Sequence, residues 1–155
     1  MARYDSIKKL GHKQWFASVG KRVAPRLDRA VIKLSGGRLR SGDGGPMPTL
    51  LLTHRGRKTG RTRQTPLGFF RDGDRLVVIG SNWGQEHDPA WALNLVAEPH
   101  ASVQVGRERW DVVACVTEGE ERERLWSRGL EMWPAYDTYE KRSGRLIKVF
   151  VLDRV

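Results

Sequence analysis

Two apolar runs joined by a short cationic loop, within residues 49–70, constrain the fold more than any other feature of the sequence. The first run is Thr49–Thr53 and the second is Gln64–Phe70. Both are rich in the apolar and β-branched residues that favour strands, and the interval between them is too short for a helix. The sequence therefore predicts an antiparallel β-hairpin at this point of the chain.

The loop of this hairpin is strongly basic and contains two glycines. Gly56 and Gly60 allow the backbone to turn with positive φ and to bring its N–H groups close to a ligand. Arginine binds phosphate or carboxylate through paired hydrogen bonds, and lysine adds a point charge. The loop therefore suits a polyanion, with a solvated, arginine-rich hairpin tip as the alternative. Its cationic residues are Arg55, Arg57, Lys58, Arg61 and Arg63.

The whole chain is basic, with a formal net charge of +10 and a sequence pI of about 10.4. This charge implies an anionic partner, which could be nucleic acid, a membrane surface or a small polyanionic cofactor. The 155 residues correspond to a single domain, and no apolar run approaches the roughly 18 residues of a membrane-spanning helix. Cys115, the only cysteine, lies in an apolar run and is expected to be buried and inert. We expect a protein of a reducing, cytoplasmic compartment.

Residues 1–47 form an N-terminal region of basic amphipathic helices and a loop, and the amphipathic pattern occupies residues 1–40. Trp15, Val19 and Val23 recur at a spacing of four and so share one helical face, and Pro25 divides the segment into two helices. The apolar face either packs on the domain or docks on an anionic bilayer as a peripheral contact. A glycine- and proline-rich loop follows at residues 41–48.

Residues 48–155 alternate between strand and helix patterns. Asp88 is a candidate N-cap, with Pro89 at the first helical position. The fold class predicted is α+β, a single-domain split β-barrel of about six mostly antiparallel strands with flanking helices. Further strands are expected at 75–81, 101–105, 109–117 and 146–152, and helices at 89–98, 118–132 and 134–141.

Several motifs in this region together resemble the deazaflavin (F-420)-dependent nitroreductase family of the flavin/deazaflavin oxidoreductase split-barrel superfamily. The resemblance spans residues 48–155 and implies a domain that binds coenzyme F-420, a two-electron hydride carrier with a phosphodiester and a polyglutamate tail. The motifs are GRKTG at 56–60, TPL at 65–67, RDGDRLVVIGS at 71–81, DPAWALNLVAEP at 88–99 and MWPAYDTYEKR at 132–142.

The resemblance also implies which residues bind the coenzyme. The phosphate and tail would contact Arg57, Lys58 and Thr59. The side chain leading to the ring would follow Arg63, Gln64, Thr65, Pro66, Leu67 and Gly68. The ring would lie against Ile79, Gly80, Ser81 and Asn82, with Ala90, Trp91, Ala92, Leu93, Asn94 and Tyr136 closing the site.

Candidate catalytic residues are Tyr136, Tyr139 and Ser81, and Trp83 and Trp133 would complete an acceptor pocket. A tyrosine hydroxyl can protonate a product, although its ordinary pKa near 10 makes it a slow acid unless tuned. Packing in the core is the alternative for both tyrosines and for Trp91. Gly68, Asn82 and Trp133 depart from residues common in the family, which leaves the acceptor open. His54 and His87 are isolated, so no metal site is predicted.

The sequence therefore predicts an oxidoreductase that passes hydride from reduced F-420 to an apolar, planar quinone or nitroaromatic. The alternatives are an FMN-binding enzyme on the same barrel, a coenzyme carrier without turnover, and a basic nucleic-acid-binding module. Only weak, salt-sensitive binding to nucleic acid is expected. Barrels of this kind often dimerise through an exposed sheet face, so a homodimer is a further expectation.

Overall fold

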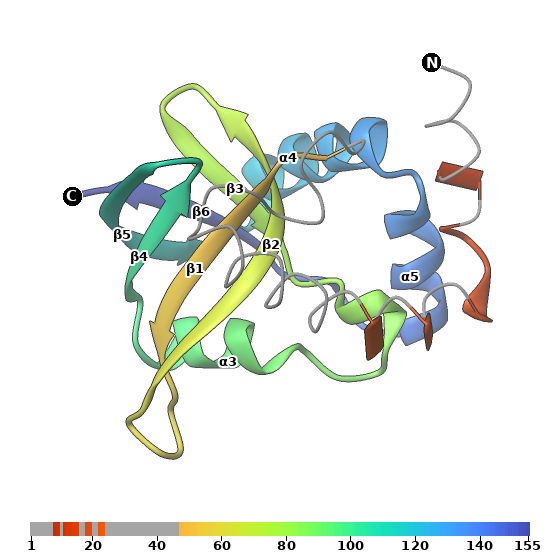
Figure 1. Ribbon diagram of the computed structural model, residues 1–155. Coiled ribbons are helices and arrows are strands. Elements are labelled where there is room, and N and C mark those ends of the chain that lie inside the picture. The colour runs from red at the N-terminus through yellow and green to blue at the C-terminus, as the bar shows by residue number, and fades with distance from the viewer. Residues whose placement is uncertain (1–7, 10, 16–17, 20–21, 24–46) are drawn as a thin grey trace.

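The computed structural model describes residues 8–9, 11–15, 18–19, 22–23 and 47–155, and its centre is a closed barrel. The six strands follow the order β1-β2-β3-β6-β5-β4, and the pairing of β4 with β1 closes the sheet (Figure 1). Every neighbouring pair is antiparallel. The strands are β1 (Thr49–Arg55), β2 (Thr62–Asp72), β3 (Arg75–Ile79), β4 (His100–Val105), β5 (Glu108–Val116) and β6 (Val149–Arg154).

Helices cover one end and one side of the barrel. Helix α3 packs at the end of the barrel against β1 and β5, whereas α4 and α5 lie together beside it (Figure 1). A short 3-10 turn, η1, follows β3 and packs on α5. The bounds are η1 (Asn82–Gly84), α3 (Ala90–Ala97), α4 (Gly119–Met132) and α5 (Ala135–Ser143).

Two of the strands are buried on both faces, which explains their unbroken apolar runs. In β3, Leu76 and Val78 point into the barrel, while Val77 and Ile79 face the layer formed by α4 and α5. Strand β6 does the same, with Phe150 inside the barrel. Side chains alternate between the two faces of a strand, so a strand between two apolar layers needs apolar residues at every position. The helix-side layer leads to the candidate site.

The α+β barrel predicted from the sequence is confirmed, and so is the hairpin that begins it. Thr49 pairs with Gly68 and Arg55 with Thr62, which places the cationic loop at the hairpin tip. The last strand begins later than predicted, at Val149, because Leu146 is 66% exposed and Lys148 turns away to form an ion pair.

The predicted N-cap of α3 is wrong. Pro89 occupies the N-cap position without a side-chain cap, and Asp88 forms ion pairs instead. Its carboxylate lies 2.7 Å from Arg145 Nη1 and 2.5 Å from Lys148 Nζ. Charge-assisted hydrogen bonds to two cations stabilise a carboxylate more than one backbone N–H does, so the long-range partners prevail.

Cys115 is exposed, which contradicts the prediction of a buried thiol. It follows Ala114, whose side chain is only 8% exposed and lies in the barrel core. Because neighbouring residues on a strand point to opposite faces, burial of Ala114 directs Cys115 outward.

The described residues near the N-terminus contact α5 and its flank. His12 Nδ1 lies 2.6 Å from Thr138 Oγ1, and a Cβ on Gly11 would come within 2.5 Å of the Trp133 indole. The break predicted at Pro25, the helix expected beyond it and residues 41–46 of the loop lie outside the described residues. Within the part that the structure describes, no helix is long and apolar enough to cross a membrane.

Candidate active site

The basic hairpin tip and the start of α3 enclose a cavity of about 540 Å³, here called the cationic cavity. Its floor is a tight loop, in which Gly56 N donates to Arg61 O at 2.8 Å and Gly60, at φ +65°, donates to Gly56 O at 2.7 Å. This turn directs several cationic side chains to one place. The cavity is lined by His54, Gly56, Arg57, Lys58, Thr59, Arg63, Gln64, Thr65, Ala90, Trp91 and Asn94.

A buried amide connects α3 to the loop. Asn94 is 6% exposed, and its Oδ1 accepts hydrogen bonds from Arg57 N and from Arg57 Nη1, both at 3.1 Å. Since both acceptor contacts lie on the oxygen side, the Nδ2 group faces His54, with Nδ2 3.3 Å from His54 Nδ1. Asn94 therefore fixes the backbone and the guanidinium of Arg57 together.

His54 completes this chain of contacts in its neutral form. An amide N–H₂ can only donate, so His54 Nδ1 must accept and its proton lies on Nε2, which is 3.1 Å from Thr65 Oγ1. The side chain is 4% exposed, and burial, assisted by the charge of Arg63, lowers the pKa of His54. The imidazole thus holds Asn94 in the orientation that Arg57 requires.

A second cavity, of about 290 Å³ and here called the aromatic cavity, opens on the other side of Trp91. Trp91 is 7% exposed and also packs on Phe150, with ring centroids 5.4 Å apart. It is therefore both a core residue and a wall between the two cavities. The aromatic cavity is lined by Met47, Pro66, Leu67, Gly68, Ile79, Ser81, Asn82, Trp83, Trp91, Trp133, Tyr136 and Tyr139.

Met47 reaches into the aromatic cavity over a glycine. A Cβ on Gly68 would lie 2.2 Å from Met47 Sδ, so any larger residue at position 68 would displace the thioether. Tyr136 donates its hydroxyl to the same sulfur, with the oxygen 3.7 Å away. The space that a side chain at 68 would occupy is thus filled by methionine, which is flexible and adapts to flat ligands.

The two tyrosines of this cavity are buried and protonated. Tyr136 is 8% and Tyr139 1% exposed, and burial raises the pKa of each hydroxyl above its ordinary value. Among the described residues, the Tyr139 hydroxyl is one of two buried side-chain polar atoms, with Arg122 Nε, that have no hydrogen-bond partner. A buried unsatisfied hydroxyl is costly, and a polar atom of a bound ligand would satisfy it.

A strained turn separates the aromatic cavity from a third cavity. Asn82 and Trp83 both adopt positive φ, at +46° and +56°, which is unfavourable for residues with a Cβ. The turn is held by hydrogen bonds from Asn82 Nδ2 to His87 O at 2.9 Å and from Arg142 Nη2 to Trp83 O at 2.6 Å. It therefore presents the Trp83 indole in a fixed place.

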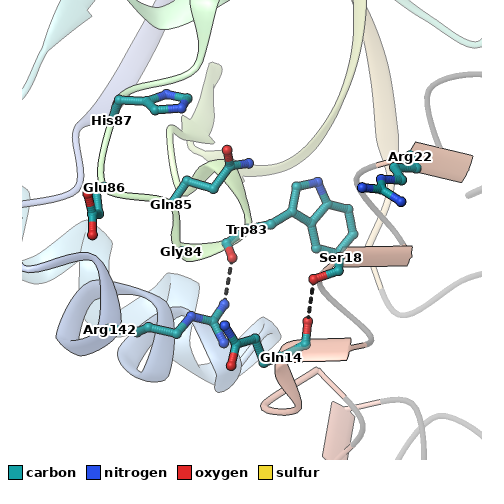
Figure 2. A pocket seen from close by; sticks show the side chains of 9 residues that line it. All are labelled: Gln14, Ser18, Arg22, Trp83, Gly84, Gln85, Glu86, His87 and Arg142. Carbon is teal, nitrogen blue, oxygen red and sulfur yellow. Dashed lines mark hydrogen bonds between the residues drawn. The ribbon is translucent and has the colours of Figure 1, made fainter.

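This third cavity, here called the outer cavity, has a volume of about 520 Å³ (Figure 2). The N-terminal segment forms one of its walls through Gln14, Ser18 and Arg22, which recur at a spacing of four. That segment therefore turns a polar face toward the barrel, while Trp15 and Val19, which follow Gln14 and Ser18 in the chain, are 57% and 51% exposed. The remaining lining residues are Trp83, Gly84, Gln85, Glu86, His87 and Arg142.

Most of the residues predicted from the sequence to form the site line these cavities. The cationic cavity contains Arg57, Lys58, Thr59, Arg63, Gln64, Thr65, Ala90, Trp91 and Asn94. The aromatic cavity contains Pro66, Leu67, Gly68, Ile79, Ser81, Asn82, Trp91, Tyr136 and Tyr139. Three predicted residues line neither cavity: Gly80, Ala92 and Leu93.

Sequence reasoning did not assign His54 or Met47 to the site. The sequence does contain a pattern that points to His54. It lies two residues after Leu52 in β1, on the same inward face as Leu50 and Leu52. A polar side chain at an inward-facing position needs a hydrogen-bond partner. Gly68 in a strand was a signal for a close approach by another group, but nothing in the sequence identified that group as Met47. No group of His, Cys, Asp and Glu side chains suited to a metal ion exists within the described residues.

Comparison with known proteins identifies the family. The family model described as F-420H(2)-dependent quinone reductase matches residues 25–154. The chain belongs to this family. An F-420H(2)-dependent quinone reductase of Mycobacterium tuberculosis is 35% identical over 132 residues, which are 83% of this chain and 89% of that protein.

Solved structures of members and relatives share the fold. The structure of an F-420-H2 dependent reductase (FDR-A) is 36% identical, covers 68% of this chain and 94% of its own, and superposes with a TM-score of 0.63. A second structure, described as a domain-swapped dimer, is also 36% identical, with a TM-score of 0.64 over 68% of this chain and 80% of its own. The deazaflavin resemblance is thus confirmed, and the comparisons support F-420 as the cofactor rather than FMN. They do not confirm the nitroreductase designation.

The residues present fit this cofactor. An acidic arm requires an array of cations, and a flat ring requires an apolar slot with few polar contacts. The cationic cavity supplies Arg57, Lys58 and Arg63, and the aromatic cavity supplies the slot with the unsatisfied hydroxyl of Tyr139.

Proposed function

We propose that this protein is a reductase that binds coenzyme F-420 across the cationic and aromatic cavities and reduces a planar acceptor of the quinone class. The observation that supports this most strongly is that Trp91 lines both a basic cavity and an aromatic cavity, so the two lie side by side. A ligand with an acidic arm and a flat ring fits these two cavities, with the arm in the basic one and the ring in the aromatic one. When bound in its reduced form, the coenzyme supplies a hydride from its deazaflavin ring.

Arg57, Lys58 and Thr59 would hold the phosphodiester and the acidic tail, with Arg63 beside them. These side chains are exposed at the hairpin tip and face one cavity, so an anion can approach them while Arg57 keeps its hydrogen bonds to Asn94. Gln64 and Thr65 would contact the arm between the phosphodiester and the ring. Asn94 and Ala90, at the start of α3, would position the loop from the other side.

The flat ring would lie between the Pro66–Gly68 step of β2 and the Ile79–Asn82 segment. Pro66, Leu67 and Ile79 are apolar, and Ser81 and Asn82 provide polar contacts at the rim. The ring-binding surface would be supported from behind by Gly80, Ala92 and Leu93, which do not line the cavity. Gly80 N donates to Lys148 O at 2.9 Å, and Ala92 is fully buried, so both support the slot without lining it.

Tyr136 and Tyr139 would serve as neutral hydrogen-bond donors to the acceptor or the ring. Because burial raises the pKa of both hydroxyls, neither is tuned to release its proton readily near neutral pH. We infer that they orient and polarise a carbonyl oxygen, that Ser81 adds a further hydroxyl, and that the proton for the product comes through solvent. A nitroaromatic, which is also planar and carries polar oxygens, is the second acceptor class.

Stopped-flow oxidation of the reduced coenzyme tests this function. The absorbance of F-420 should return on mixing with a naphthoquinone, and a nitroaromatic should be compared at equal concentration. Tyr139→Phe should lower the turnover rate with little change in coenzyme affinity. A folded protein that binds F-420 yet shows no oxidation with any acceptor would favour a carrier over a reductase.

We further propose that the N-terminal segment contacts an anionic bilayer. Trp15, Val19 and Val23 are exposed on its surface, and lysines 8, 9 and 13 adjoin them. Sedimentation with phosphatidylglycerol vesicles should deplete the protein from solution, and phosphatidylcholine vesicles should not. The change Val19→Asp should abolish sedimentation, whereas equal sedimentation of the variant would exclude this contact.

A homodimer is our proposal for the assembly. It is supported by the related structure described as a domain-swapped dimer. Light scattering after size-exclusion chromatography should give twice the mass of the chain, and a monomer at all concentrations would reject it.

A further inference from the structure

We propose that the outer cavity binds an anionic group carried by the acceptor, so that the acceptor is a planar ring with a carboxylate-type substituent. This inference rests on the proposed reductase function and specifies its substrate class. It follows from the order of the three cavities, from their sizes and from the charges that line the outer one.

The three cavities share walls in a fixed order. Trp91 lines both the cationic and the aromatic cavity, and Trp83 lines both the aromatic and the outer cavity. The coenzyme arm would leave the aromatic cavity on the Trp91 side. If an acceptor ring stacks in that cavity, its substituents must therefore extend on the Trp83 side.

The aromatic cavity is too small to hold both partners of the reaction completely. Ligand sites range from about 300 to 1,000 Å³, and this cavity measures about 290 Å³. A deazaflavin ring and an acceptor ring would fill it. A substituent on the acceptor must then extend past Trp83 into the outer cavity, which adds about 520 Å³.

The chemistry of the outer cavity favours a negative group. Arg22 and Arg142 both line it, and among the described residues no carboxylate forms an ion pair with either (Figure 2). By contrast, Arg122 and Arg145 are engaged by Glu140 and Asp88 at 2.7 Å. Among the described residues of the lining, Glu86 is the single carboxylate, so positive charge predominates there.

The rest of the lining also suits a polar group rather than a hydrocarbon chain. Carboxamides of Gln14 and Gln85, the Ser18 hydroxyl and the His87 imidazole surround the space, together with the Trp83 indole. An apolar tail placed there would cover this polar lining without offering it hydrogen bonds, which is unfavourable. A carboxylate would instead receive paired hydrogen bonds from a guanidinium.

The strained turn keeps the two cavities distinct. Gly84, at φ +74°, lies so close to α5 that a Cβ would meet Arg142 Nη2 at 2.7 Å and Tyr139 Cα at 3.0 Å. Arg142 is thereby held beside Trp83 O, with its guanidinium at the outer cavity. Unfavourable backbone conformations persist where many surrounding contacts hold the residues in place, and such residues are common at ligand sites.

A redox-inert pair of probes tests the inference directly. The full-length protein is loaded with oxidised F-420 and titrated with 2-naphthoate and with 2-naphthamide, which have the same ring and differ in charge. We expect naphthoate to bind about tenfold more tightly, from one charge-assisted contact. The change Arg22→Gln should reduce the preference, because Arg142 remains, and Arg22→Glu should abolish it, while naphthamide affinity stays the same.

Arg107→Gln is the matched control, because Arg107 is exposed at the β4–β5 turn and lines none of the three cavities. It should leave the preference intact. Equal affinity of the two probes for wild-type protein, or an unchanged preference in Arg22→Glu, would overturn the inference, and so would tighter binding of a quinone with a long hydrocarbon tail than of one with a carboxylate. Failure of F-420 itself to bind would instead overturn the proposed function.

Discussion

The change Asn94→Asp should move the His54 proton to Nδ1 and raise the pKa of the imidazole. In the native protein Asn94 Nδ2 faces His54 Nδ1 at 3.3 Å, and that contact requires an unprotonated Nδ1. Aspartate keeps the acceptor for Arg57 but offers only lone pairs to His54. The imidazole must then donate from Nδ1, and the neighbouring carboxylate favours the charged imidazolium over the neutral tautomer, which raises the pKa of His54.

The size of the effect follows from the strength of that pair. A hydrogen bond to a charged group is worth about 1.5–3 kcal/mol, and 1.36 kcal/mol corresponds to one pKa unit. The pKa of His54 should therefore rise by between about one and two on substitution. The assay is an NMR titration of the imidazole signals of the coenzyme-free protein, with His54→Gln used to assign the resonance.

The pH dependence of stability should weaken as well. In wild-type protein the pKa of His54 is lowered by burial, so the unfolded chain binds the extra proton and stability falls as the pH drops through the ordinary value near 6.5. In Asn94→Asp the pKa of folded His54 rises toward the unfolded value, so less stability should be lost as the pH drops below 6.5. A His54 pKa that is the same in both proteins would refute the proposed tautomer and the positioning role of Asn94.

Three further changes have distinct expected outcomes. Gly68→Ala should leave the melting temperature almost unchanged, because only the flexible end of Met47 must move, but it should change the KM for a naphthoquinone severalfold. Asp72→Asn should cost about 1 kcal/mol in urea unfolding at pH 7 and progressively less as the pH falls below the ordinary pKa of aspartate, since hydrogen bonds from Arg124 and Arg75 lower the pKa of Asp72 and that stabilisation is lost only as the pH approaches the lowered value. Asp88→Asn should cost about 3 kcal/mol in the same assay, because it leaves Arg145, only 14% exposed at its side chain, without a counter-ion.

The fold could be predicted because its signals are local. The alternation of Leu50 and Leu52 in β1 and the continuous apolar runs of β3 and β6 follow from burial on one face or on both. The cationic tip could be predicted for a similar reason, since charges and glycines crowded at one turn are visible in the sequence. The prediction that this loop binds the acidic arm of F-420 rests on the family resemblance, because the residues alone indicate only a polyanion.

The features that were missed depend on contacts between distant parts of the chain. Asp88 fits a helix N-cap by its local sequence, but the fold brings Arg145 and Lys148 within ion-pair distance. His54 has no partner nearby in sequence, and the fold places Asn94 beside it. Local patterns carry no information on such pairs, so the polar contacts that orient the site emerge only from the structure.

The most direct test of the account is the affinity of the protein for oxidised F-420, measured by fluorescence titration for wild type and for the double change Arg57→Ala, Lys58→Ala. Each charge-assisted contact is worth about 1.5–3 kcal/mol, so the Kd should rise at least about a hundredfold. The exposed cations of the control double change, Arg71→Ala and Arg107→Ala, line none of the three cavities, and their loss should leave the Kd within about twofold. Circular dichroism should show all three proteins folded. An unchanged Kd in the Arg57, Lys58 variant would contradict the assignment of the cationic cavity to the acidic arm of the coenzyme.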